Sequence, residues 1–107
     1  MKKFTTFIMF FMMAFVIPAV VVAQDAVDRT DVTSGVVEIS VQNDGFDFIP
    51  SEIRVNEGVT VRLTFENTGG QHDWVLDEFD AATEVIRRGQ SETIEFVADE
   101  AGEYEFY

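Results

Sequence analysis

Hydrophobic and polar residues alternate along much of the chain after residue 35. Val37, Ile39 and Val41 are separated by polar side chains, and a longer run of the same kind covers residues 59–67. A period of two places successive side chains on opposite faces of a β-strand, so that one face can be buried. The pattern therefore predicts two half-buried strands, and shorter runs of the same kind lie between and after them.

Short segments rich in Gly and Asn separate these runs, at residues 43–45, 56–58 and 68–70. Asn and Gly tolerate positive φ, so each segment predicts a turn. Pro50 cannot donate a ladder hydrogen bond and predicts a strand edge or break. Six short strands with no long amphipathic helix are typical of an all-β, antiparallel β-sandwich. Residues 77–89 are less regular and predict a short helix or a loop.

Large apolar side chains with strand parity are the candidates for the core. Trp74 shares its parity with His72 and Leu76, so core packing is its expected role. The other aromatic residues expected in the core are Phe46, Phe48, Phe65, Phe96, Tyr104 and Phe106.

The first 23 residues have the layout of a secretory signal peptide. Lys2 and Lys3 precede an apolar run, and Ala23 is the last residue before the predicted cleavage site. This predicts export to the periplasm, the cell surface or the medium. The apolar run exceeds the usual length of about 7–15 residues, so an uncleaved N-terminal anchor is the alternative. Polar residues 24–35 predict a flexible lead-in, and residues 36–107 form the predicted domain.

Charge limits the partners of the predicted mature chain, residues 24–107. It contains five basic and twenty acidic residues, a net charge of −15. Nucleic acid and anionic membrane surfaces would repel such a chain, apart from any N-terminal anchor. A basic protein partner, a very salty medium or simple solubility would each account for the charge. Arg87 and Arg88 are the only adjacent basic pair in this part, and we expect them to be solvated.

The sequence contains few of the side chains that commonly act in catalysis. The chain has no cysteine, its four methionines all lie within the first 13 residues, and His72 is its only histidine. Ser51 and Ser91 lie in no nucleophile motif. Acidic pairs such as Asp77-Glu78 lie at predicted turns without an implied cleft. We therefore expect that the chain is not an enzyme. A lone histidine in a polar loop is, by itself, usually a surface residue.

The order of several short motifs nevertheless resembles the cupredoxins, the small blue-copper electron carriers. The segments that carry the resemblance are Phe48-Ile49-Pro50, residues 53–58, residues 61–65, Asn67-Thr68-Gly69, His72-Asp73, residues 89–91, residues 94–96 and residues 102–107. Together they span about 60 residues. The resemblance implies a Greek-key β-sandwich, copper as the cofactor and a redox protein as the partner.

The resemblance also implies roles for two residues. His72 matches the first copper ligand, and Asp73 matches a polar residue that ties the histidine loop to the loop of the ligand cysteine; an ordinary solvated acid is the other interpretation of Asp73. Blue-copper sites need two imidazoles and a thiolate. In the family the cysteine, second histidine and methionine would follow Tyr107. We therefore expect an incomplete domain that lacks the ligand loop and last strand and does not bind copper tightly.

Two alternatives remain open at this stage. The absence of sulfur from residues 24–107 is compatible with a copper-free β-sandwich that serves as a binding or accessory module in the periplasm or at the cell surface. A weak metal site formed by His72 and carboxylates is the other.

Overall fold

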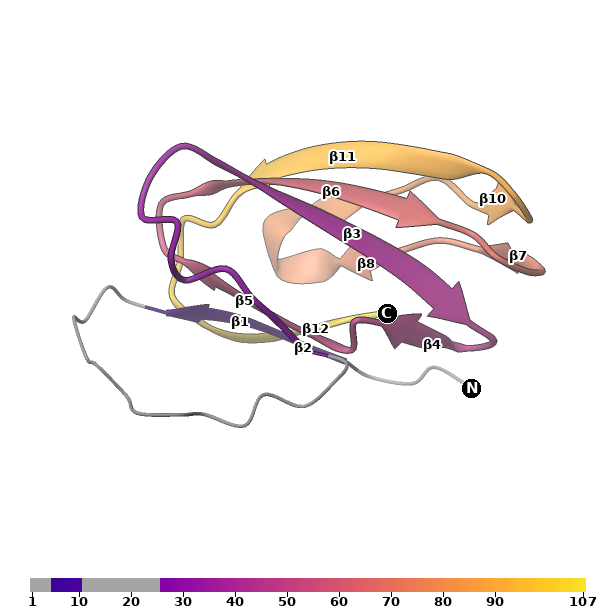
Figure 1. Cartoon of the computed structure of the whole chain (residues 1–107), viewed down its shortest axis with the longest axis horizontal. Helices are drawn as coiled ribbons and strands as arrows, with labels where there is room; N and C mark the ends of the chain where they lie inside the picture. The colour runs from indigo at the N-terminus through magenta and orange to yellow at the C-terminus, as the bar shows by residue number, and fades with distance from the viewer. Residues whose placement is uncertain (1–4, 11–25) are drawn as a thin grey trace.

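The computed structural model describes residues 5–10 and 26–107, which form two four-stranded sheets packed face to face (Figure 1). The first sheet has the order β12-β1-β5-β2, and the second has the order β11-β6-β3-β4. The strands of the first sheet are β1 (Thr5–Phe10), β2 (Ala26–Asp28), β5 (Glu52–Asn56) and β12 (Gly102–Phe106). Those of the second are β3 (Val36–Asp44), β4 (Asp47–Ile49), β6 (Thr60–Glu66) and β11 (Ser91–Val97).

The irregular segment between β6 and β11 contains four very short strands and one turn of 3-10 helix, η1 (Asp77–Phe79). Two of these strands, β7 (Gln71–His72) and β10 (Ile86–Arg87), pair with each other. The other two, β8 (Val75–Leu76) and β9 (Ala81–Ala82), form a second small ladder. Residues 77–89, predicted as a short helix or a loop, therefore contain one turn of 3-10 helix and two strands of two residues each, β9 and β10.

The predicted β-sandwich is confirmed, but its sheets are mixed and not purely antiparallel. β3 pairs with β6 in parallel, and both β1 and β2 pair with β5 in parallel. The reason lies in the connection: after β4 the chain crosses to the first sheet as β5 and then returns as β6. Two strands joined by such a crossing can enter one sheet in the same direction, whereas a tight hairpin requires opposite directions. Periodicity alone carries no information on strand direction.

The core lies between the two sheets and follows the predicted parity. β3 alternates strictly between exposed and buried side chains from Val36 to Asp44. The apolar positions of residues 59–65 are all fully buried on one face of β6 and the residue before it. Burying such side chains contributes roughly 1.5–3 kcal/mol each, which makes this layer the main source of stability. Its largest members are Trp74, Phe7, Phe65, Phe106, Ile53 and Leu63.

Aromatic rings connect the two sheets across the core. Phe48 contacts both Phe65 and Phe106, with ring centroids 5.7 and 5.6 Å apart. Phe46, also expected in the core, is instead 74% exposed. It lies in the turn after β3, where the alternation that predicted its burial has ended, and its ring stands edge-on to His72.

The N-terminal part of the chain differs from the prediction. Residues 1–23 were expected to lie outside the fold, yet Thr5–Phe10 forms β1 between β12 and β5. The lead-in is also held in place: β2 pairs with β5, and the Asn56 amide donates hydrogen bonds to the carbonyls of Thr30 and Val32, both at 2.8 Å. The apolar residues of a leader are equally suited to a sheet core, which explains the difference. The predicted cleavage site lies outside the described residues.

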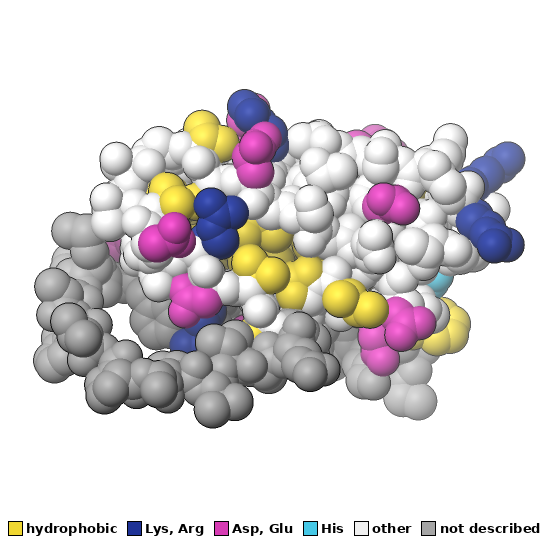
Figure 2. Space-filling model, viewed as in Figure 1, with side chains coloured by type: hydrophobic (Ala, Val, Ile, Leu, Met, Phe, Trp, Pro, Cys, Tyr) yellow, Lys and Arg dark blue, Asp and Glu magenta, His cyan; other side chains and the backbone are white. Residues whose placement is uncertain are grey.

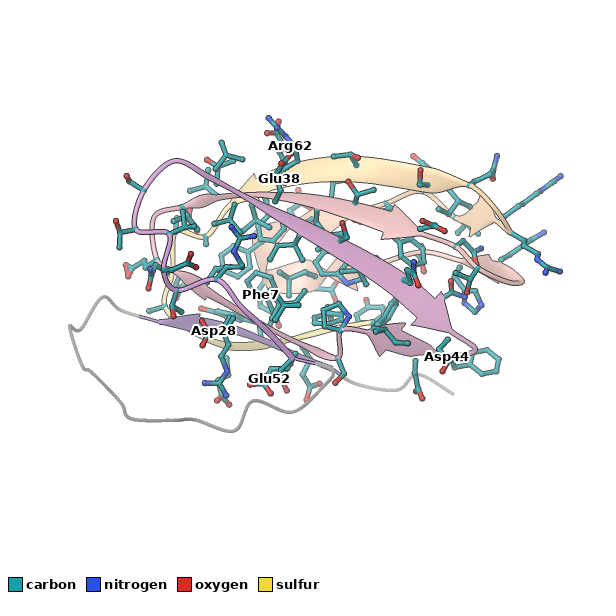
Figure 3. The ribbon with its side chains drawn as sticks, viewed as in Figure 1. Phe7, Asp28, Glu38, Asp44, Glu52 and Arg62 are labelled. Carbon is teal, nitrogen blue, oxygen red and sulfur yellow. The ribbon has the colours of Figure 1, made fainter. Side chains whose placement is uncertain are left out.

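Charged side chains on the outer face of the second sheet form ion pairs between adjacent strands. Arg62 of β6 lies beside Glu38 on β3 (Figure 3), with a nitrogen–oxygen distance of 3.3 Å, and it also reaches Glu95 on β11 at 3.1 Å. The hydrogen bonds that Arg62 donates to the carboxylates of Glu38 and Glu95 raise the pKa of Arg62. The pairs join three adjacent strands, but such exposed pairs contribute little to stability. Among the described residues, no helix has the length and apolar character needed to span a membrane.

Candidate functional site

His72 lies at one end of the sandwich, in the two-residue strand β7. It is half-exposed, and its strand neighbour across the ladder is Ile86. The Phe46 ring stands at 82° to the imidazole, with the ring centroids 5.9 Å apart. Gly70, at φ +74°, passes so close that a Cβ there would lie 3.2 Å from Nε2 of His72. A side chain at position 70 would therefore displace the imidazole as well as strain the backbone.

The buried side chain of Asn67 holds the loop that leads to His72, residues 68–70, by hydrogen bonds. Its Oδ1 accepts a hydrogen bond from the Gly69 N–H at 2.9 Å. Its Nδ2 donates to the carbonyls of Gly70 at 3.0 Å and Ile86 at 2.6 Å. One amide thus joins the loop before His72 to β10, the strand that pairs with His72.

A second buried amide, that of Asn43, holds the same loop from β3. Its Oδ1 accepts from the Thr68 N–H at 2.7 Å, and its Nδ2 donates to the Gly69 carbonyl at 3.1 Å. The Thr68 hydroxyl donates to the Asn43 carbonyl at 2.7 Å. Because buried polar groups are costly unless they are paired, these bonds make residues 68–70 a rigid connection.

Asn43 was expected as a turn residue and Asn67 as the end of the strand over residues 59–67, and neither expectation included a role in holding the loop. The alternation of residues along the two strands already indicated that both asparagines lie on the buried face. Asn43 continues the buried series of Val37, Ile39 and Val41, and Asn67 continues that of residues 59–65. A polar side chain on the apolar face at the end of a strand indicates that it holds a neighbouring loop by hydrogen bonds.

The segment after His72 returns to the core, as the parity predicted. Trp74 is fully buried, stacks on Phe96 and lies 5.2 Å from the Phe106 ring. Its main-chain N–H donates to the Thr83 hydroxyl at 3.0 Å, and its carbonyl accepts from the Thr83 N–H at 2.9 Å. His72 therefore lies two residues from a buried tryptophan whose main chain is hydrogen-bonded to Thr83.

Tyr107 lies beside this same segment. Its main chain exchanges two hydrogen bonds with Val75, at 2.7 and 2.9 Å. Its hydroxyl donates to Oδ2 of Asp77 at 2.8 Å. The motif at residues 102–107 is thereby brought next to the segment that carries His72 and Asp73, although the two are some 30 positions apart in the sequence.

The Tyr107 phenol provides a test of this contact. The hydrogen bond to Asp77 is the main cause that raises the pKa of Tyr107, followed by burial and nearby carboxylates that include Asp73. Because the folded-state pKa lies above the unfolded one, the contact stabilises the fold below the ordinary phenol pKa of about 10 and is lost as the pH rises through the folded-state value. We expect Asp77→Asn to lower the pKa of Tyr107.

The measurement is a spectrophotometric titration of tyrosinate, with Tyr104→Phe as background so that Tyr107 alone is observed. Burial is the main cause that raises the pKa of Tyr104, so in the matching Tyr107→Phe background Asp77→Asn should leave that titration unchanged. Identical Tyr107 titrations with and without the Asp77 carboxylate would contradict the contact.

The side chains around His72 do not form a complete copper site. Among the described residues, no group of three or more His, Cys, Asp or Glu side chains is placed to hold a metal ion. Asp73 follows His72 directly and is half-exposed. The basic pair Arg87-Arg88 is exposed near the same end, where Lys and Arg side chains project in Figure 2. The arrangement offers one imidazole on a rigid loop, with no thiolate in the sequence.

Comparison with known proteins agrees with this geometry. The sequence profile of the family described as "Cupredoxin-like domain" matches residues 7–107, which begins inside β1 and extends through β12 to Tyr107. No curated protein and no solved structure gave a significant match. The match covers nearly all of the sequence and every described strand except the first two residues of β1. The chain therefore belongs to the cupredoxin-like domain family.

Proposed function

We propose that this domain is the scaffold of an exported copper protein that carries single electrons, with His72 as one of the copper ligands. The observation that carries the proposal is the pairing of Tyr107 with Val75. In the sequence resemblance, residues 102–107 precede the ligand cysteine and His72 is the first histidine. The fold places these two segments side by side, as a shared metal site would require.

The rigid loop supports a ligand role for His72. A carrier of single electrons needs ligands that move little when copper changes its oxidation state. Asn43 and Asn67 hold residues 68–70 by hydrogen bonds, and the imidazole lies so near Gly70 that a Cβ there would be 3.2 Å from Nε2 of His72. The imidazole of His72 is therefore held in position without a bound metal ion.

The remaining ligands are not among the described residues. With no cysteine and one histidine in the sequence, a type 1 copper site would need its thiolate and second imidazole from residues outside these 107. The contribution of these 107 residues to such a site would be to supply His72 and to hold its loop in place. We assign no catalytic step to it.

The charge and the N-terminal segment define the rest of the proposal. A net charge of −15 on residues 24–107 favours a redox partner with a basic docking surface, and disfavours nucleic acid and anionic membrane surfaces. The apolar segment before Ala23 would direct the protein to the periplasm, the cell surface or the medium.

A copper-free binding or accessory module is the second candidate. The observation that favours it is the absence of sulfur ligands from residues 24–107 together with the lack of a metal-ligand cluster among the described residues. The coding sequence beyond Tyr107 separates the two candidates. A cysteine soon after Tyr107, followed by a histidine and a methionine, would support the copper protein. An in-frame stop codon would overturn it and leave the module.

Copper titration of the 107-residue chain provides a biochemical test. We expect no intense visible thiolate-to-copper band with Cu(II), because no thiolate is present. Any weaker binding should depend on the single imidazole and decrease at least tenfold in His72→Ala, with the adjacent, exposed Gln71→Ala as the control. Equal uptake by the His72→Ala variant would refute the ligand role, and an intense blue band would show that no outside ligand is needed.

A further inference from the structure

The carboxylates of this domain far outnumber the cations that could pair with them. Residues 24–107 contain no lysine, and their five arginines face twenty acidic residues. Three of these arginines form ion pairs within the described part of the chain. The acids that they contact are Asp31, Glu38, Glu52 and Glu95. Even if every arginine were paired, the net charge of −15 on residues 24–107 would remain.

Two turns that carry acidic residues are held side by side at the end of the sandwich opposite β7 (Figure 1). The Gly58 N–H donates to the Ala98 carbonyl at 2.7 Å, and the Ala98 N–H donates to the Val59 carbonyl at 2.9 Å. Glu57 and Asp99 directly flank these bonded residues in the sequence. The fold therefore brings two acids that are far apart in the sequence to the same end of the molecule.

Tyr104 lies where these acidic residues converge. Its hydroxyl donates to the carbonyls of Glu100 and Ala101 at 3.1 and 3.2 Å, and its ring lies edge-on to Phe79 of η1, with the centroids 4.9 Å apart. Burial is the main cause that raises the pKa of Tyr104, and four nearby carboxylates raise it further. Among the residues that the structure describes, none of the four takes part in an ion pair. These four, called here the acidic end cluster, are Glu57, Glu78, Asp99 and Glu100.

Repulsion within the acidic end cluster opposes folding. Residues 57, 78 and 99–100 are distant in the unfolded chain, and only the fold brings their charges together. Salt screens two exposed charges well only when they are farther apart than the Debye length, which is about 8 Å at physiological ionic strength and about 3 Å at 1 M. Carboxylates grouped around one phenol have separations of this order. Physiological salt therefore leaves much of their repulsion, whereas molar salt removes most of it.

We propose that the acidic end cluster makes the folding of this domain dependent on molar salt, so that the protein works in a concentrated salt solution. This inference does not rest on the proposed copper role. It goes beyond that role, because it assigns the medium in which the fold is stable.

Thermal unfolding of the full 107-residue chain in KCl tests the salt dependence. We expect the melting midpoint, followed by the emission of Trp74, to rise by about 15 °C or more between about 0.1 and about 3 M KCl. A change of less than about 5 °C over this range would overturn the proposal. A rise that is complete below about 0.3 M would also overturn it, because ordinary screening would then be sufficient.

Two matched triple variants separate the acidic end cluster from the net charge. The first neutralises three members of the cluster: Glu57→Gln, Asp99→Asn and Glu100→Gln. The second neutralises three acids that pair with arginine, and it changes the net charge by the same amount: Glu38→Gln, Glu52→Gln and Glu95→Gln. At about 0.1 M KCl, we expect the first triple variant to melt about 5 °C or more above the unsubstituted chain, and the second to melt at or below it.

The two triple variants should also differ in their response to KCl. We expect the first to lose at least half of the rise in midpoint, and the second to retain it. Equal midpoints for the two triple variants at low salt would overturn the role of the cluster, because the net charge alone would then account for the repulsion. An equal rise with KCl in all three chains would overturn it as well, since a general effect of salt on burial acts on every variant alike.

Discussion

Removal of residues 1–23 is expected to abolish the cooperative unfolding of the chain. The shortened chain loses Phe7 from the core, and β5 and β12 lose their shared partner. Deletion of a buried phenylalanine side chain alone costs about 3–5 kcal/mol. A domain of this size has a total stability of about 4–13 kcal/mol, and the chain has no disulfide that could compensate. The loss of a central strand should therefore exceed what the fold can tolerate.

Circular dichroism and Trp74 emission as a function of temperature measure this effect. A chain that lacks only Lys2 and Lys3 is the control, because it retains β1 and should melt as the full chain does. We expect the shortened chain to show weak, non-cooperative transitions and an indole exposed to water. A sharp melt at the midpoint of the full chain would contradict the importance of β1.

Asn67→Ala is expected to destabilise the protein by about 3 kcal/mol and to loosen the loop before His72. The substitution leaves the Gly69 N–H and the carbonyls of Gly70 and Ile86 without their amide partner. Each buried polar group left unpaired costs about 1–3 kcal/mol, although water that enters the cavity would recover part of this. The cost is large because Asn67 is completely buried.

Thermal and denaturant unfolding measure the stability, and Glu66→Ala on the exposed face of β6 is the matched control. His72 is the only histidine, so its ring signals in an NMR spectrum are identified without assignment. We expect these signals to shift and broaden in Asn67→Ala but not in Glu66→Ala. Unchanged stability together with unchanged His72 signals would show that Asn67 does not hold the loop.

Much of the sandwich could be predicted from residue parity. The series of Val37, Ile39 and Val41 predicted β3 correctly, and residues 59–65 predicted β6. Successive side chains of these strands face the core and the solvent in turn, so the sequence alternates between apolar and polar residues. The burial of Trp74 followed from the same argument. Phe46 shows where the argument fails: once the chain enters a turn, parity no longer specifies a side, and the ring is exposed next to His72.

The candidate site was predicted less completely. The sequence indicated His72 and Asp73 through their place in an ordered series of motifs. It did not show that Asn43 and Asn67 hold the loop before His72. Asn43 bonds to Thr68 and Gly69 across 25 and 26 positions, and Asn67 bonds to Ile86 across 19; only its bonds to Gly69 and Gly70 are local. Their buried parity was the available signal.

The sequence by itself determined the all-β class, the two main strands of the second sheet, the central apolar residues and the lack of sulfur in residues 24–107. These properties depend on local alternation and on composition. Only the tertiary structure decided that β3 and β6 run parallel, that Tyr107 lies beside Val75, and that Thr5–Phe10 fills the slot between β5 and β12. An apolar segment carries the same pattern whether it enters a membrane or a sheet. Its place is decided by which unpaired strand edges and which cavity the rest of the chain offers it.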